Sequence, residues 1–241
     1  MARKKTLEIA KPTIAEVLEQ FLADQAKRLA AGTLAQYENI VGLLEDCLNG
    51  YASNSLDKAE EELFDRHYNA RGTKHREFCE VFGPEHILSN VGEFLGYFMI
   101  RKVMAGKDTL RAAGTVTKKL AKWLAEKGYV EAEEAEFAAE QGGDAARELP
   151  EAADLAADIN DFTDGQERAQ VGSTIEGHFT LTRVDPGKVW LDEMISGLKI
   201  GPVEIPEKIT RRCKTGWTIS GSVERAGNRW RIVEAWNVYP R

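Results

Sequence analysis

Basic side chains gather between residues 101 and 127, and their spacing suits phosphate binding. This stretch holds eight Lys/Arg residues against Asp108 and Glu126. At about 100° per residue, Arg111, Lys118 and Lys122 fall on one helix face, opposite apolar residues such as Leu120. Several cations on one rigid face can each displace a counterion from a nucleic-acid backbone. The predicted nucleic-acid-binding residues of this stretch are Arg101, Lys102, Lys107, Arg111, Lys118, Lys119 and Lys122. The alternative is a solvated outer helix face, although such a face normally mixes charge signs.

A second basic group lies near the C-terminus, just before Trp217. It consists of Lys208, Arg211, Arg212 and Lys214, which we take as a second candidate contact loop. Cations beside exposed aromatic rings suit single-stranded nucleic acid, which is bound by stacking and by phosphate contacts. We nevertheless favour a core position for most of the tryptophans Trp190, Trp217, Trp230 and Trp236, because a domain of about 70 residues needs such large side chains.

Residues that could support catalysis or metal binding lack the required spacing. The sequence contains no phosphate-binding glycine loop, no nucleophile elbow and no dinucleotide-binding glycine motif. His67, His75, Cys79 and His86 are too loosely spaced for a predicted zinc site. We therefore expect no enzyme activity, no metal and no cofactor.

The elements that must position these residues are helices in the first 130 residues. Capping boxes are predicted at Thr13 and Thr33, each followed by apolar residues at helical spacing, and Gly32 is expected to end the first helix. Further helices are expected over 56–68 and 87–103, and from 108 to a stop at Gly128. Four to five amphipathic helices with short connections predict a bundle.

The rest of the chain changes character twice. Residues 131–170 are rich in Ala and Glu, with Gly142, Gly143 and Pro150 as expected breakers, so we predict an acidic linker. From Val171 the pattern alternates with period two. It predicts a hairpin with strands over 175–184 and 188–195 around the turn 185–187, a second with strands over 217–225 and 229–239 around the turn 226–228, and a short strand between the hairpins. The expected fold class is α+β with two domains: a helical bundle at 1–130 and a small antiparallel β-barrel at 171–241, either SH3-like or OB-like.

Charge is segregated along the chain, so the net charge of -7 hides the character of each part. The acidic excess lies in residues 131–170, with 2 basic and 13 acidic residues, whereas the flanking segments are neutral to basic. No apolar run approaches the roughly 20 residues of a membrane span, and no secretory signal follows the basic start. The three scattered cysteines indicate reduced thiols, so we expect a cytoplasmic protein that does not bind membranes.

Three features of residues 13–130 form a recognisable pattern: Gly32-Thr33 with Tyr37 one turn later, the aromatic segment 94–98, and the closing segment 120–130. On this pattern, residues 13–130 resemble the SAM-like core-binding domain of tyrosine recombinases and phage integrases. This resemblance implies a helical domain that clamps DNA. The family's catalytic half is absent, because no His-x-x-Arg element occurs in the chain.

These observations predict a non-catalytic DNA-associated accessory protein that binds phosphates through a basic helix face. The alternative is a protein–protein interaction adaptor without nucleic-acid binding. The acidic residues of the second helix, Glu38, Glu45 and Asp46, favour that alternative.

Overall fold

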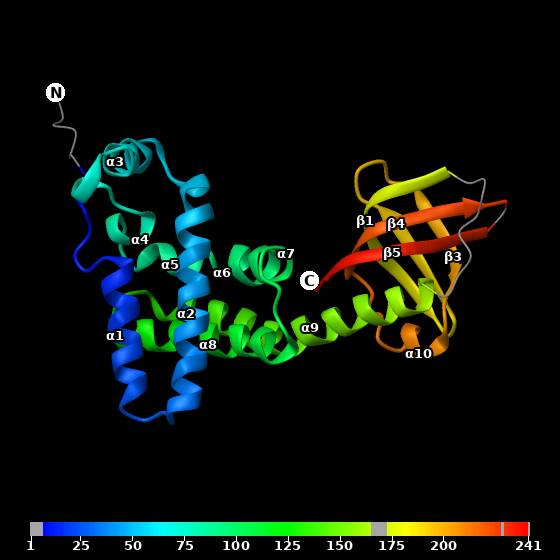
Figure 1. The fold of residues 1–241 in the computed structure, drawn as a ribbon, viewed down its shortest axis with the longest axis horizontal. Coiled ribbons are helices and arrows are strands. Elements are labelled where there is room, and N and C mark those ends of the chain that lie inside the picture. The colour runs from blue at the N-terminus through cyan, green and yellow to red at the C-terminus, as the bar shows by residue number, and fades with distance from the viewer. Residues whose placement is uncertain (1–6, 165–172, 228, 241) are drawn as a thin grey trace. The chain divides into compact units, whose positions relative to one another are not determined.

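The computed structural model describes residues 7–164, 173–227 and 229–240. The chain divides into two compact units (Figure 1). The first, which we call the helical unit, comprises Met1–Met99 and Thr109–Ala146, and the second, the barrel unit, comprises Ile100–Asp108 and Arg147–Arg241. The mixed helix-and-sheet class and the two-part layout agree with the sequence-based prediction.

The first helix, α1 (Ile14–Ala26), begins at the predicted capping box. The Thr13 hydroxyl accepts from the Glu16 amide at 3.3 Å, and the Glu16 carboxylate accepts from the Thr13 amide at 2.9 Å. The expected apolar stripe, which includes Val17 and Phe21, is buried. Helix α1 ends at Ala26, and the amides of Arg28 and Leu29 both donate to the Gln25 carbonyl at 3.0 Å.

Helix α2 (Ala31–Tyr51) lies beside α1 and buries its predicted stripe, including Ile40 and Leu44 (Figure 1). The second capping box was wrong, because α2 begins at Ala31 and has no side-chain cap, so Gly32 and Thr33 already lie in its first turn. The turn between α1 and α2 lies earlier in the chain than predicted, because the hydrogen bonds to the Gln25 carbonyl already end α1.

The middle of the helical unit consists of short helical segments. They are η1 (Ala52–Ser55), α3 (Lys58–Tyr68), η2 (Gly72–Lys74), α4 (Phe78–Val81), α5 (Glu85–Ser89), α6 (Val91–Glu93), the π-helix η3 (Phe94–Phe98) and α7 (Met99–Arg101). The single helix predicted over 87–103 is therefore interrupted, first at Asn90, whose backbone leaves the helical region, and again by the π-turn. Its apolar residues, such as Ile87 and Phe94, are nevertheless buried as expected.

Helices α8 (Lys107–Glu126) and α9 (Ala132–Thr163) complete the helical part of the chain. Gly128 adopts a positive φ of 73° and follows α8, which confirms its predicted role as a terminator. Where α8 and α9 cross, Gly114 and Gly142 are packed backbone against backbone. A Cβ atom on Gly142 would lie 2.8 Å from the Gly114 carbonyl oxygen.

The acidic linker prediction is corrected by α9. Residues 132–163 form one helix that passes through Gly142, Gly143 and Pro150, the expected breakers. The helix contributes Leu155 and Ile159, both 0% exposed, to the core of the barrel unit. This burial outweighs the poor helix propensity of the glycines and of Pro150. The boundary between the units lies inside α9, between residues 146 and 147, whereas residues 165–170 of the predicted linker lie outside the described residues.

In the described part of the barrel unit, five strands form a sheet. They are β1 (Ser173–Asp185), β2 (Lys188–Glu193), β3 (Lys199–Glu204), β4 (Thr218–Ala226) and β5 (Arg229–Tyr239), with the short helix α10 (Glu207–Thr210) between β3 and β4. The strand order is β1-β2-β3-β5-β4, and β4 pairs back onto β1, so the sheet closes on itself. The prediction of a purely antiparallel sheet was wrong for one pair, because β3 and β5 run parallel. The β1–β2 and β4–β5 hairpins were both predicted, although Asn228 of the second turn lies outside the described residues.

Tryptophan burial in the barrel unit differs from the prediction. Trp217 is buried, Trp190 and Trp230 are half-buried, and Trp236 is 44% exposed. The register of β4 against β5 shifts twice, so that Ala235 enters the core in place of Trp236. Asn160 of α9 binds at this irregularity, since its side-chain amide donates to the Ala235 carbonyl at 2.7 Å and accepts from the Ala235 amide at 2.9 Å.

Candidate nucleic-acid interface

Helix α8 is buried on two sides, which leaves a narrow solvent-exposed strip. Trp123 packs edge-on against Phe21 of α1, with ring centroids 5.5 Å apart, while Gly114 contacts α9. The exposed strip of α8 consists of Arg111, Thr115, Lys118, Lys119, Lys122 and Glu126. Four of these six side chains are cationic and only one is acidic, so the predicted basic face is present within the helical unit.

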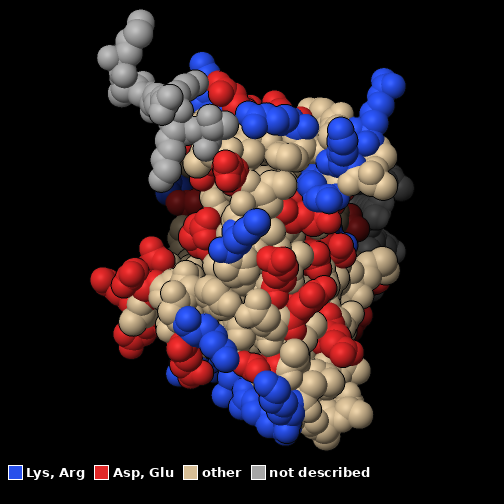
Figure 2. Space-filling model, turned by 90° about the vertical axis from the view of Figure 1, so that its left-hand side faces the viewer, with Lys and Arg blue, Asp and Glu red and all other residues tan. Residues whose placement is uncertain are grey.

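The exposed strip borders a surface hollow of about 380 Å³ between the ends of α1 and α8. We call it the lysine hollow. Its lining residues are Asp24, Gln25, Lys27, Arg28, Lys119, Lys122, Trp123, Glu126 and Lys127. Five Lys/Arg side chains thus face two carboxylates, an excess of three positive charges. Figure 2 shows Lys and Arg gathered at the lower end of the face it draws, the end at which α1 turns into α2 in Figure 1.

Asp24 organises one wall of the lysine hollow. Its carboxylate binds Lys127 Nζ at 2.8 Å, Lys27 Nζ at 2.7 Å and the Trp123 indole nitrogen at 3.1 Å. Hydrogen bonds from Lys127, Lys27 and Trp123 hold the pKa of the Asp24 carboxyl well below its ordinary value. This single carboxylate therefore binds both Lys27 and Lys127, and its one negative charge offsets one of their two positive charges.

The remaining cations of the lysine hollow are Arg28, Lys119 and Lys122. The Arg28 guanidinium donates to the side-chain oxygen of Gln25, which is only 2% exposed, so Arg28 is held by a buried neutral group. None of the three forms an ion pair with any residue in the described ranges. The hollow consequently presents three cations whose charge is not matched by a bound carboxylate.

The other residues predicted in the 101–127 stretch lie elsewhere or have partners. Arg101, Lys102 and Lys107 belong to the barrel unit, and Lys107 forms an ion pair with Asp154. Arg101, Lys102 and Arg111 are exposed, but each has an interaction partner of its own. The structure therefore brings Lys119 and Lys122 together at the lysine hollow, whose lining does not include the other predicted residues of this stretch.

The second predicted group, before Trp217, is occupied by carboxylates within the barrel unit. Arg212 binds Asp154 at 3.1 Å and Asp158 at 2.9 Å. Lys214 binds Glu151 at 2.7 Å and Glu148 at 3.4 Å. Hydrogen bonding to Glu151 raises the pKa of Lys214, and its ammonium also lies 4.8 Å from the Trp217 ring centroid.

The other two residues of this basic group, Arg211 and Lys208, lie on or directly after α10. Arg211 pairs with Glu207 at 2.7 Å, whereas Lys208 is exposed on α10. The structure therefore assigns Arg212 and Lys214 to docking the acidic face of α9, and it leaves Lys208 as an isolated surface cation of the group.

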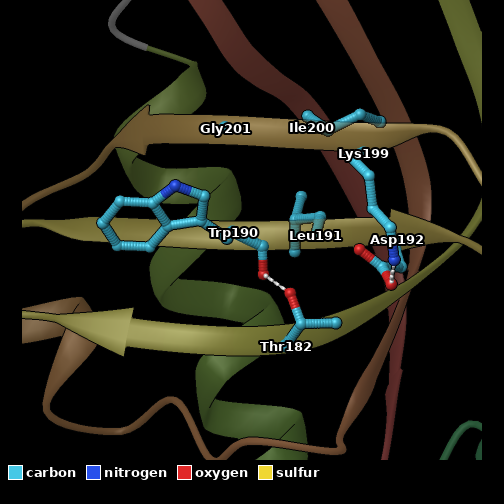
Figure 3. A pocket seen from close by; sticks show the side chains of 7 residues that line it. All are labelled: Thr182, Trp190, Leu191, Asp192, Lys199, Ile200 and Gly201. Atoms are coloured by element: carbon cyan, nitrogen blue, oxygen red, sulfur yellow. Dashed lines mark hydrogen bonds and ion pairs between the residues drawn. The ribbon is translucent and has the colours of Figure 1, made fainter.

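A second hollow, of about 240 Å³, lies on the β1-β2-β3 face of the barrel unit (Figure 3). Trp190 rests against Gly201, whose φ is +140° and whose missing Cβ makes room for the indole ring. The Arg183 guanidinium covers this ring at 4.3 Å and binds Asp185, while Lys199 pairs with Asp192. Because these cations are matched by carboxylates, this face presents less unmatched positive charge than the lysine hollow.

Sequence reasoning missed the turn between β2 and β3. Met194 is 62% exposed and Ile195 is 93% exposed, although both were expected at the end of a strand. The Glu193 carboxylate fixes the turn, since it accepts from the Ile195 amide at 3.1 Å and from the Ser196 amide at 2.6 Å. The Ser196 hydroxyl also donates to the Glu193 carboxylate at 2.6 Å. The bond from this hydroxyl, together with the two amide bonds, lowers the pKa of Glu193, and all three hold the apolar side chains in an ordered turn.

Sequence reasoning also missed Lys27 and Arg28. Their adjacent basic side chains at the end of α1 were a usable signal, but nothing in the sequence placed them beside Lys119 and Lys122. The loosely spaced histidines form local contacts, with His75 beside Glu77 at 3.0 Å and His86 beside Glu60 at 3.3 Å. Within the described residues, no group of three or more His, Cys, Asp or Glu could hold a metal ion.

No helix in the described part of the chain combines the length and apolar content needed to cross a membrane. The chain matches no protein-family model, and neither a curated protein nor a solved structure shows significant similarity to it.

Proposed function

We propose that this chain is a non-catalytic accessory protein that binds nucleic-acid phosphates through the exposed strip of α8 and the adjoining lysine hollow. One observation carries the proposal: Arg28, Lys119 and Lys122 converge on a concave surface without a carboxylate that neutralises them. Each cation that meets a backbone phosphate releases a condensed counterion, which favours binding. A concave wall also concentrates the positive potential.

The structural alternative is that these cations only offset the negative ends of two helix dipoles. That explanation fits Lys27 and Lys127, which follow the last residues of α1 and α8 and bind Asp24. It does not account for Lys119, which lies about two turns before the end of α8, or for the predominantly positive exposed strip. The excess charge is therefore better explained by an anionic partner.

Fold-level analogy gives secondary support. A helical unit of the SAM-like kind would suit DNA clamping, as the resemblance to tyrosine recombinases implies. For the barrel unit, we favour an OB-like over an SH3-like assignment, because five strands close in the order β1-β2-β3-β5-β4. Both assignments are analogies, and the lysine hollow is the main support for the proposed function.

The test is a fluorescence anisotropy titration of duplex DNA with the whole protein at several salt concentrations. Lys119→Glu combined with Lys122→Glu should weaken binding strongly. If both lysines touch phosphate, the slope of log affinity against log salt should flatten by roughly 2. Lys58→Glu combined with Lys74→Glu is the matched control, because both lysines are exposed in the same unit away from the hollow. Equal losses in both double variants, or no salt-sensitive binding by the wild type, would refute the proposal.

A second candidate function is a protein–protein interaction adaptor, and the β2–β3 turn favours it. Met194 and Ile195 present apolar surface on a turn fixed by Glu193, a feature expected of an anchor at a protein interface. Ile195→Asp should abolish capture of a protein partner from cell extract while leaving DNA affinity unchanged. Capture that persists in this variant would remove the support for the adaptor function.

A further inference from the structure

We infer that the lysine hollow binds the terminal phosphate monoester of a nucleic-acid strand, so that the protein prefers phosphorylated strand ends to continuous duplex. This inference rests on the proposed function and names the group that the same site would recognise. It draws on the charge of the hollow, on its walls and on the hydrogen bonds at the two helix ends that form it.

The charge balance of the hollow favours a monoester. Once Asp24 has bound Lys27 and Lys127, the cations Arg28, Lys119 and Lys122 remain, with Glu126 as the only other carboxylate in the lining. A backbone phosphodiester carries one negative charge. A phosphate monoester carries about -1.5 to -2 near neutral pH and offers three acceptor oxygens. With five cations and two carboxylates in its lining, the hollow has an excess of three positive charges, which the charge of a monoester offsets better than that of a diester.

The walls of the hollow are preorganised for a compact anion. Arg28 is anchored by the buried Gln25 side chain, and Lys27 is anchored by Asp24. Lys127 is held both by Asp24 and by the Trp123 ring, whose centroid lies 5.5 Å from its ammonium nitrogen. Because these side chains are already positioned, little conformational entropy is lost when an anion binds.

Two helices end at the hollow, and their carbonyl groups would repel an anion if they were unsatisfied. Several of these carbonyls already accept hydrogen bonds from backbone amides. The Gln25 carbonyl accepts two amides at 3.0 Å. At the end of α8, the Trp123 carbonyl accepts the Lys127 amide at 3.0 Å, and the Leu124 carbonyl accepts the Tyr129 amide at 2.9 Å. The free cations are thus not needed to cap the helices, and they remain available to a ligand.

The experiment compares one duplex sequence with 5′-phosphate, 3′-phosphate or hydroxyl ends, together with a closed circular duplex, by competition anisotropy with the full chain. We expect one phosphorylated end to bind about tenfold more tightly than the hydroxyl end. Lys119→Gln with Lys122→Gln should abolish that preference, whereas Lys58→Gln with Lys74→Gln should retain it. Circular dichroism of each variant verifies folding.

The possible outcomes distinguish a failure of the terminal-phosphate inference from a failure of the proposed function. Equal affinity for phosphorylated and hydroxyl ends, with salt-sensitive binding intact, overturns the terminal-phosphate inference and leaves the proposed function standing. Binding of a phosphopeptide or of inorganic phosphate at micromolar concentration, without binding of any DNA, overturns both. A preference for phosphorylated ends that survives Lys119→Gln with Lys122→Gln in a folded protein also overturns the inference, because the preference would then arise elsewhere.

Discussion

At the scale of single residues, Asp24 links stability to pH. Because its folded pKa lies below the ordinary value of 3.8, its ionised form stabilises the native state above that pH. This contribution is lost as pH falls from 3.8 through the lower folded pKa. We expect Asp24→Asn to unfold at a lower temperature than the wild type at pH 6, with the difference shrinking below pH 3.8. Thermal melts across this range test the prediction, and a difference independent of pH would contradict it.

Gly201 is a second single residue with a measurable role. Its φ of +140° suits glycine, and a Cβ atom would lie 2.7 Å from Trp190 Cδ1. Gly201→Ala should therefore destabilise the barrel unit by about 1–3 kcal/mol, through backbone strain and displacement of the indole ring. Denaturant unfolding followed by tryptophan fluorescence measures the effect. Unchanged stability would show that β3 can shift to accommodate the methyl group.

At the scale of elements, the crossing of α8 and α9 depends on the absence of side chains. A Cβ atom on Gly142 would lie 2.8 Å from both the Gly114 carbonyl oxygen and the Lys118 amide nitrogen. Gly142→Ala should separate the helices and cost about 1–3 kcal/mol. Gly42→Ala is the control, because Gly42 lies in α2 with open space around it and should stabilise its helix by up to about 1 kcal/mol. Two substitutions with the same effect in chemical denaturation would disprove the close crossing.

At the scale of the whole molecule, the acidic middle of the chain is part of the folded structure. Carboxylates of α9, such as Asp158 and Glu151, bind Arg212 and Lys214, so acidic and basic residues from separate segments of the sequence pair within the barrel unit. Ala152, Leu155 and Ile159 of α9 belong to the core of the barrel unit. The strands thus depend on a helix that lies before them in the chain.

Fragments test this dependence. A fragment spanning 147–241 should fold and unfold cooperatively, whereas one spanning 171–241 should not. Each buried Leu or Ile contributes about 1.5–3 kcal/mol, a large share of the stability of so small a domain. Circular dichroism and thermal melts of the two fragments provide the measurement. Equal, cooperative melting of both would show that the strands fold without α9.

The sequence by itself determined the features that depend on local interactions. The capping box at Thr13, the apolar stripes of α1 and α2, the terminator Gly128 and the β1–β2 hairpin all follow from residue spacing over a few positions. The amphipathic character of α8 was equally readable, because burial on a helix repeats every 3.6 residues. Such signals need no knowledge of distant partners.

Tertiary structure decided the rest. Residues 132–163 form a helix because Leu155 and Ile159 are buried in the core of the barrel unit. An Ala/Glu-rich composition does not reveal the free energy gained by this burial. Trp236 turned outward because the register of β4 and β5 shifts. The lysine hollow exists because α1 and α8 meet, with Asp24 bound to Trp123 across 99 positions of sequence. Charged residues so far apart in the sequence form one site only when packing brings their helices together. Spacing along the chain does not determine which helices become neighbours.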